Sequence, residues 1–384
     1  MNTPIPLSNP DITDLERNAV MEVLNTPNLS LGPKLPEFEA GLAQFTGVPY
    51  AVAMSSGTAV LHCIIKALGI GKGDYAITTP FSFISTSNCL LMEEAQPIFV
   101  DIDTHTYNLT PESVEKTYLS LPLSIRRRVR AVIYVDVFGV PADGPGFEAL
   151  GKKYGLHIID DSAEALGSSI DGRKCGSFGD AGLYAFYPNK QVTTGEGGVL
   201  ITKHHELAVR AKSLRNQGRD EGAGWLQHAR LGYNYRLSDI NCSLGIAQMK
   251  RFDELLKKRR GVKEHYDSLF EDFFTKGILI PQQIPQNSFV SPFVYVLRLA
   301  DHFQPGDREA LLDYLRKNNI GCSNYFTPIH LQPHYTELDS KKGDMPETER
   351  ICERTIALPF FNNLTGEQIE RVVETVKRSP LFSK

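Results

Sequence analysis

The sequence predicts an α/β protein built on a mainly parallel β-sheet with helices on both faces. Short apolar segments typical of strands alternate with longer segments in which apolar residues recur at helical spacing, and no tandem repeat breaks the alternation. Short apolar strands separated by helices are buried on both faces, which is the pattern of a parallel sheet. At 384 residues and 41% hydrophobic content, the chain is long enough to bury a large core.

The expected elements follow this alternation along the chain. Helices are expected at 12–24, 35–45, from the turn at 55–58 to residue 68, at 307–318 and at 366–377, and strands at 50–54, 75–79, 97–100, 131–137, 156–160, 181–186, 198–202 and 289–299. The strands 181–186 and 198–202 are close enough in sequence to form an antiparallel pair. After residue 250 the sequence pattern changes to a charged helix followed by two prolines. We therefore expect a larger domain over 1–250 and a smaller α/β domain over 251–384.

Composition excludes several classes of function. The formal net charge is -4, so no charge excess indicates a nucleic-acid partner or an anionic membrane. The six scattered cysteines include no C-x-x-C pair, and nothing near the D-x-D sequence at Asp101 and Asp103 completes an oxygen cage, so no metal site is expected. No apolar stretch reaches the length of a membrane span. We expect a cytoplasmic protein with a small-molecule ligand.

A lysine in a polar, glycine-rich segment between two expected strands is the first candidate for chemistry. Lys190 lies in the sequence Tyr-Pro-Asn-Lys-Gln-Val-Thr-Thr-Gly-Glu-Gly-Gly at 187–198. Loops at strand ends hold functional groups on a rigid sheet, although most lysines in such places are simply exposed. The glycines match neither a nucleotide phosphate loop nor a dinucleotide-binding turn, so a nucleotide-phosphate loop is disfavoured.

Paired carboxylates at the end of an expected strand are the second candidate. Ligands of parallel α/β sheets lie beyond the carboxyl ends of the strands, where Asp160 and Asp161 stand. From the local pattern alone, either residue is equally well interpreted as a cap of the following turn. A lysine and an acid are together the two protein groups that pyridoxal 5'-phosphate (PLP) requires, one for its aldehyde and one for its ring nitrogen.

Two further motifs suit a phosphate and a flat ring. Ser55-Ser56-Gly57-Thr58 opens a helix after a strand, and a helix N-terminus offers free N–H groups to an anion, although ordinary capping explains the same pattern. The segment 80–86 places Phe83 after a strand, where its ring could stack on a planar cofactor or simply pack in the core.

These motifs, in this order, closely resemble the DegT/DnrJ/EryC1/StrS family of PLP-dependent nucleotide-sugar aminotransferases. The resemblance covers nearly the whole chain. It rests on 32–33 and 37–39, 56–58, Phe83, 161–164, 188–190, 193–198, 214–218, 231–239, 328–333 and 358–359.

The resemblance implies a fold, a set of roles and a shared site. The fold would be the aspartate aminotransferase type, fold type I, with a seven-stranded large domain and a smaller C-terminal domain. Lys190 would carry PLP as a Schiff base and move the proton, and the active sites would lie at a homodimer interface. Asp161 would contact the ring nitrogen, Phe83 the ring face, Gly57 and Thr58 the phosphate, Asn234 the neighbouring subunit's phosphate, and His330 the substrate cleft.

Two positions depart from the family pattern. Glu164 stands where many relatives have Gln or His near the phenolic oxygen of the cofactor, and two anions there would repel each other unless one is protonated or bridged. Some family members that aminate 4-keto sugars are similar to this chain in having Glu, so Glu164 is counted among the cofactor-binding residues as a variant. Ala185 stands where relatives often have a phosphate-binding Ser, so one phosphate contact is expected to be lost.

The implied activity is transfer of an amino group from an amino acid, by family habit L-glutamate, to a nucleotide-linked keto sugar, with Glu164 and the Pro188-Asn189-Lys190 segment favouring amination at C4. The product would be an amino sugar for a polysaccharide or glycoconjugate. A related sugar dehydratase is disfavoured because such relatives replace the lysine with histidine. A regulatory protein without turnover is disfavoured because Lys190, Asp161 and the phosphate-site residues are retained together.

Overall fold

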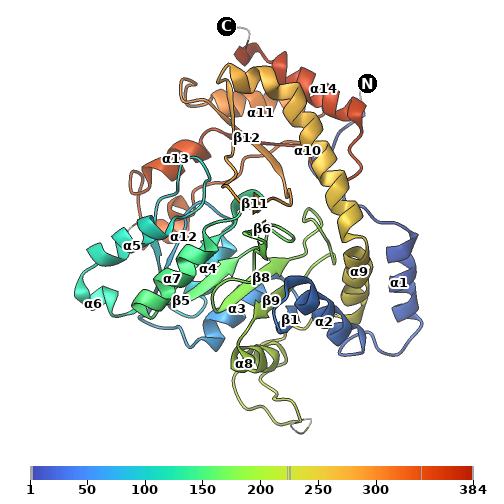
Figure 1. Ribbon diagram of the computed structural model, residues 1–384, viewed down its shortest axis with the longest axis vertical. Helices are drawn as coiled ribbons and strands as arrows, with labels where there is room; N and C mark the ends of the chain where they lie inside the picture. The colour runs from blue at the N-terminus through green and yellow to red at the C-terminus, as the bar shows by residue number, and fades with distance from the viewer. Residues whose placement is uncertain (1–2, 223, 225, 339, 383–384) are drawn as a thin grey trace.

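The computed structural model describes residues 3–222, 224, 226–338 and 340–382, and its centre is a seven-stranded sheet (Figure 1). Strand β9 runs antiparallel to both of its neighbours, β1 and β8, and the five strands from β8 to β3 pair in parallel with one another. In sheet order the strands are β1 (Tyr50–Met54), β9 (Gly198–Thr202), β8 (Ala181–Ala185), β5 (His157–Asp161), β4 (Val129–Val135), β2 (Tyr75–Thr78) and β3 (Gln96–Phe99).

The predicted α/β class and the mainly parallel sheet are confirmed. Every strand expected between residues 50 and 202 is present, and the strand ends differ from the expected ones by no more than two residues. The antiparallel pairing of β8 with β9 is also confirmed, with Leu183 opposite Leu200. The loop that joins these two strands carries Lys190, so the pairing fixes both ends of that loop.

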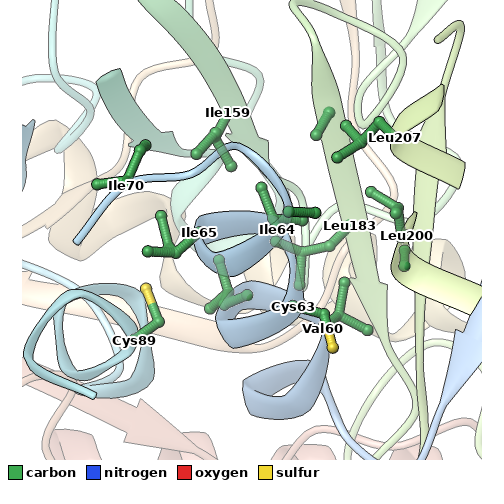
Figure 2. Close-up of a cluster of buried hydrophobic side chains, with 14 of the residues drawn as sticks. Val60, Cys63, Ile64, Ile65, Ile70, Cys89, Ile159, Leu183, Leu200 and Leu207 are labelled. Atoms are coloured by element: carbon green, nitrogen blue, oxygen red, sulfur yellow. The ribbon is translucent and has the colours of Figure 1, made fainter. Parts of the chain in front are cut away.

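Helices cover both faces of the sheet. Side chains alternate between the two faces along each strand, so each face presents apolar side chains that a helix can bury. On one face Met54, Ile133 and Leu183 pack against α3, α4 and α8, around the apolar cluster of Figure 2. On the other face the strands pack against α2 and α9 and against α5 and α7. These helices are α2 (Lys34–Thr46), α3 (Gly57–Ala67), α4 (Ser85–Leu91), α5 (Pro111–Ser120), α7 (Gly144–Tyr154), α8 (His205–Arg215) and α9 (Asp239–Lys250).

The C-terminal third forms a second layer of sheet and helices, joined to the first by the long helix α10 (Phe252–Thr275) (Figure 1). Its own core includes Ile5, so the N-terminal segment packs with the C-terminal part. The sheet is β10 (Leu279–Pro281), β12 (Tyr295–Leu299) and β13 (Thr355–Leu358). The remaining helices are α1 (Asp14–Leu24), α6 (Leu123–Arg126), α11 (Asp307–Lys317), α12 (Pro333–Thr336), α13 (Pro346–Cys352) and α14 (Gly366–Lys377), with short 3₁₀ turns η1 (Val137–Gly139), η2 (Ile329–Leu331) and η3 (Pro380–Phe382).

The expectation of one β run over 289–299 is wrong. Two strands occupy this range, because Pro292 has no N–H to donate and interrupts the ladder. The first, β11 (Ser288–Phe289), pairs with β6 (Ser169–Ile170), which also pairs with β7 (Arg173–Lys174), and the second is β12 of the C-terminal sheet. The segment between them crosses from one part of the molecule to the other and brings Phe293 toward Lys190.

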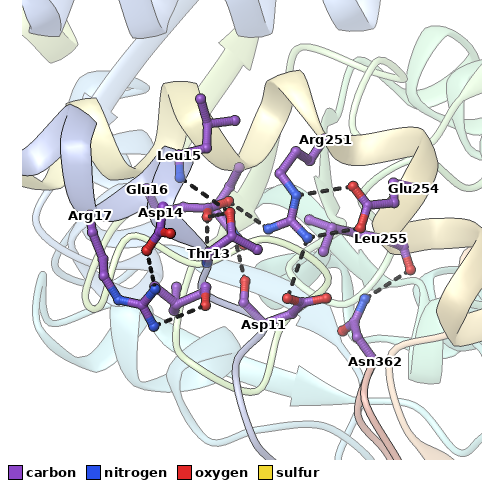
Figure 3. A network of polar contacts seen from close by, with 12 residues as sticks. Asp11, Thr13, Asp14, Leu15, Glu16, Arg17, Arg251, Glu254, Leu255 and Asn362 are labelled. Atoms are coloured by element: carbon purple, nitrogen blue, oxygen red, sulfur yellow. Dashed lines mark hydrogen bonds and ion pairs between the residues drawn. The ribbon is translucent and has the colours of Figure 1, made fainter.

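A buried ionic network fixes the start of the chain to the beginning of α10 (Figure 3). Arg251 bonds the carboxylates of Asp11 (3.3 Å), Glu16 (2.8 Å) and Glu254 (2.9 Å). The predicted division at residue 250 falls at the junction of α9 and α10, next to this network.

No helix in the described ranges is long and apolar enough to cross a membrane. The same ranges contain no group of three or more His, Cys, Asp or Glu residues that could hold a metal ion. The six cysteines are all free thiols.

Candidate active site

A cavity of about 560 Å³ opens at the carboxyl ends of the parallel strands, on the face of the sheet that packs against α3. Its volume is within the range typical of small-molecule sites. The predicted site residues Gly57, Thr58, Phe83, Asp161, Glu164 and Lys190 all line it. The structure therefore brings together six residues that span 133 positions of the sequence.

Lys190 lies in the loop between β8 and β9, and its side chain is 13% exposed. The Nζ atom is 3.7 Å from Oε1 of Glu164 and 3.9 Å from the centre of the Phe293 ring. Burial lowers the pKa of the Lys190 amine from its usual value, while the carboxylates of Glu164 and Asp161 act in the opposite direction. A lysine in this setting is closer to the neutral, nucleophilic form than an exposed one.

Asp161 ends β5 and is 3% exposed. Its Oδ2 accepts a hydrogen bond of 2.7 Å from Thr86 Oγ1, and its Oδ1 accepts one of 3.2 Å from the amide of Ala163. Burial raises the pKa of the Asp161 carboxyl, and these two hydrogen bonds oppose the rise. A buried carboxylate on the cavity wall suits a cationic partner such as a protonated ring nitrogen.

Asp160 precedes Asp161 and faces the opposite side of the sheet, since successive strand residues alternate. Ser162 Oγ lies 2.7 Å from Asp160 Oδ1 and 2.6 Å from Asp136 Oδ2. One hydroxyl hydrogen cannot serve both contacts, so one of the two carboxyls must carry a proton. Burial raises the pKa of both carboxyls, and the charge of Asp136 raises that of Asp160 further.

Glu164 is held beside Lys190 by a backbone contact. Its Oε2 accepts a hydrogen bond of 2.9 Å from the amide of Phe138, and the side chain is almost fully buried. Burial raises the pKa of Glu164, with Lys190 and the Phe138 amide opposing. The raised pKa shifts Glu164 toward the protonated form and so weakens the repulsion expected between two anions near the cofactor, while Lys190 favours the charged form.

The N-terminus of α3 forms one end of the cavity. Ser56 caps the helix by accepting from the Ala59 amide at 3.1 Å, and its carbonyl accepts from the Val60 amide, so the Gly57 and Thr58 amides are left for a ligand. A Cβ on Gly57 would lie 3.0 Å from the Cβ of Ala185, so the helix approaches β8 closely at this point. The methyl group of Ala185 lines the cavity without offering a phosphate ligand.

The three remaining predicted residues differ in their surroundings. Phe83 lines the cavity with 62% of its surface exposed, which leaves its ring open for stacking. Asn234 is exposed and His330 is buried, and neither lines the cavity within the described part of the chain. His330 Nε2 instead contacts Glu349 Oε1 at 3.0 Å, an arrangement typical of a structural histidine.

Several residues at the site were missed from the sequence. Thr86 and the amide of Phe138 orient the two acids, and Phe293, Tyr325 and Phe326 close the cavity from the C-terminal part of the chain. Thr86 stands one turn after Phe83 in a motif already singled out, so helical spacing could have indicated it. The three aromatic residues carry no local signal, because only the tertiary fold brings them to the site.

The residues present fit PLP. The donor set of one amine, one buried carboxylate and the free amides of a helix N-terminus matches the aldehyde, the ring nitrogen and the phosphate of this cofactor. The fold and the site together define a PLP-dependent enzyme of fold type I.

Comparison with known proteins gives the family. A sequence profile of the DegT/DnrJ/EryC1/StrS aminotransferase family matches residues 10–377. The chain belongs to this family and is a PLP-dependent sugar aminotransferase. It is 33% identical to the spore coat polysaccharide biosynthesis protein SpsC of Bacillus subtilis, over 97% of this chain and 96% of the relative.

Solved structures show the same fold. PseC of Helicobacter pylori, an aminotransferase involved in the biosynthesis of pseudoaminic acid, is 27% identical and superposes with a TM-score of 0.87 over 98% of this chain and 99% of its own. A putative sugar aminotransferase of Streptococcus pneumoniae, solved in its PLP form, is 25% identical with a TM-score of 0.90 over 99% of each chain.

Proposed function

We propose that this enzyme moves the amino group of L-glutamate to the keto group of a nucleotide-linked sugar, with amination at C4 of a 4-keto-6-deoxy sugar. The observation that carries the proposal is the cavity in which Lys190, Asp161, Glu164 and the N-terminus of α3 meet. The relatives named above support the pathway class, since one acts in coat polysaccharide biosynthesis and another in pseudoaminic acid biosynthesis.

The proposed roles follow from the contacts. When bound, PLP supplies a ring that stabilises negative charge on the carbon bearing the amino group. Asp161, held by Thr86, would face the ring nitrogen, and Gly57 and Thr58 would hold the phosphate. Lys190 would hold the aldehyde end of the cofactor and accept or donate a proton at its Nζ atom, and the lowered pKa of its amine favours that role.

A homodimer with shared sites is part of the proposal. Asn234 is exposed and lies outside the cavity of its own chain, and Leu231 nearby is 77% exposed. Leu226, five residues earlier, is 79% exposed as well, and exposed apolar side chains that are grouped on a surface mark a site for another chain. We place Asn234 at the phosphate of the neighbouring subunit. Mixing Lys190→Ala and Asn234→Ala subunits should then restore part of the activity that each variant lacks, because one site of the mixed dimer is intact.

The direct test is amination of a panel of nucleotide-linked sugars. The enzyme with PLP and L-glutamate is incubated with 4-keto-6-deoxy and 3-keto sugars carrying uridine or thymidine diphosphate, and the products are identified by mass spectrometry. We expect an aminated 4-keto sugar and no product from the Lys190→Ala variant. Amination at a normal rate by Lys190→Ala would contradict the mechanism, and product from the 3-keto sugars alone would contradict the assignment to C4.

A further inference from the structure

Arg259, on α10, is a buried cation without an acidic partner. It is 2% exposed, and no carboxylate in the described part of the chain lies within 4.0 Å of it. The three other buried arginines each have a carboxylate partner. These are Arg215 with Glu39, Arg298 with Asp301 and Arg308 with Glu309.

An unpaired buried charge opposes folding unless other contacts offset it. Burial lowers the pKa of Arg259 to about 10, so the guanidinium remains charged at neutral pH. Its Nε and Nη1 atoms have no hydrogen-bond partner among the described residues. Replacement of such a charge by an apolar side chain is often neutral or stabilising, so stability alone does not account for an arginine at this position.

The contacts of Arg259 lead to the lysine of the active site. Its Nη2 donates to the carbonyl of Asn189 at 2.9 Å and to the carbonyl of Lys190 at 3.1 Å. The guanidinium also lies 5.3 Å from the centre of the Phe360 ring. Through Arg259, the long helix α10 is joined to the β8–β9 loop at the residue that carries the cofactor.

The surroundings of Arg259 exclude a substrate as its missing anion. The cavity beside it has a volume of about 10 Å³, which is room for about one water molecule. Asp11 is the only acid that lines this cavity in the described part of the chain. Its carboxylate is bound by Arg251 at 3.3 Å (Figure 3) and by Lys258 at 2.8 Å. Arg259 therefore acts on Lys190 and not on a ligand.

We propose that Arg259 is a positioning residue for Lys190, which holds the backbone of the Asn189–Lys190 segment in place and keeps a positive charge beside the reacting nitrogen. The charged groups that act on this nitrogen are Asp161, Glu164 and Arg259, and Tyr187, Glu196 and Tyr325 complete the titratable groups that line the cavity in the described part of the chain. The two acids favour a proton on the nitrogen. Arg259 has the opposite effect and favours loss of that proton. This part of the inference rests on the role proposed above for Lys190.

The test is a pH titration of the visible absorbance of the PLP-loaded enzyme, followed at about 410–430 nm. Removing a neighbouring positive charge favours the protonated nitrogen, so Arg259→Met should raise the pH midpoint by roughly 1 unit. Arg259→Lys keeps the charge and should keep the midpoint. It loses the rigid guanidinium that places one nitrogen, Nη2, between the two carbonyls, so its reaction with L-glutamate should slow by roughly threefold to tenfold.

Arg260→Met is the matched control, because Arg260 is the next residue of α10 and its side chain is 51% exposed. It should change neither the midpoint nor the rate. An Arg259→Met midpoint equal to that of the wild type, in a protein with a normal melting temperature, would overturn the proposal. If Arg259→Met does not fold, Arg259→Lys decides: a wild-type rate with glutamate would overturn it. Absence of the absorbance band from the wild type would instead contradict the role of Lys190 itself.

Discussion

Asp160 and Asp161 are neighbours on one strand, yet they belong to different parts of the molecule. Asp161 faces α3 and the cavity, where Thr86 and the Ala163 amide are its protein partners. Asp160 faces the opposite side, where it shares a proton with Asp136 through Ser162 and accepts from the Gly176 amide at 2.6 Å. Because strand residues alternate in direction, one position along β5 separates an acid that lines the candidate site from an acid bonded within the fold.

The difference shows how burial acts in two environments. On both sides burial raises the pKa of the carboxyl. On the cavity side the site is arranged for a cationic ligand, which would return Asp161 to its charged form. On the other side neither Asp136 nor Asp160 forms an ion pair in the described part of the chain, and a shared proton reduces their repulsion instead. The comparison predicts that equal substitutions at the two positions have opposite consequences.

The largest expected effect is the loss of activity in Asp161→Asn. An amide cannot hold the ring nitrogen protonated, so kcat should fall by roughly 10² to 10³-fold. Asp160→Asn should keep a rate near that of the wild type, because it faces away from the cavity. Steady-state kinetics on the accepted sugar checks both. A similar loss of kcat in the two variants would contradict the claim that only Asp161 faces the active-site cavity.

Asp160→Ala should reduce stability more than activity. The substitution leaves the Gly176 amide without its acceptor in the core, which should lower the free energy of unfolding by about 2–3 kcal/mol. Asp160→Asn keeps an oxygen at that position and is the control in urea denaturation. A stability of Asp160→Ala equal to that of Asp160→Asn would show that this acid has no structural role.

Thr86→Val tests the hydrogen bond that orients Asp161. The change conserves shape and removes the hydroxyl that donates to Asp161 Oδ2 at 2.7 Å. Since this bond lowers the pKa of Asp161, its loss should favour the protonated acid and reduce kcat by roughly tenfold. Thr78→Val is the control, because the Thr78 hydroxyl is also buried but donates to the carbonyl of Ile133. The account fails at this point if both variants retain full activity.

The smallest expected effect is a change in the pH dependence of stability. The folded protein binds the shared proton more tightly than the unfolded chain, because the pKa values of Asp136 and Asp160 are raised. This contribution is fully present below about pH 4, the ordinary value for Asp, and is lost as the pH rises toward the folded pKa. Asp160→Asn should therefore lose less free energy of unfolding than the wild type between pH 4 and pH 7. An equal pH profile for both proteins would contradict the shared proton.

The sequence predicted the strands well because their signal is local. Apolar runs such as 50–54 and 198–202 are strands with the expected bounds. The local pattern could not decide between Asp160 and Asp161, because it does not show which of the two side chains points to the face of the sheet with the cavity. The expected strand also began and ended one residue before β5. Arg259 and Phe293 were missed because they reach Lys190 from the C-terminal part of the chain. The role of Glu164 stays a prediction, although its contact with the Phe138 amide explains how it is held.

The most direct measurement of the central claim is the site of cofactor attachment. The purified protein is loaded with PLP, reduced with borohydride and digested, and the labelled peptide is identified by mass spectrometry. The account predicts one labelled residue, Lys190, with a visible band before reduction that disappears when L-glutamate is added. A label on another lysine, or a band that glutamate leaves unchanged, would contradict it.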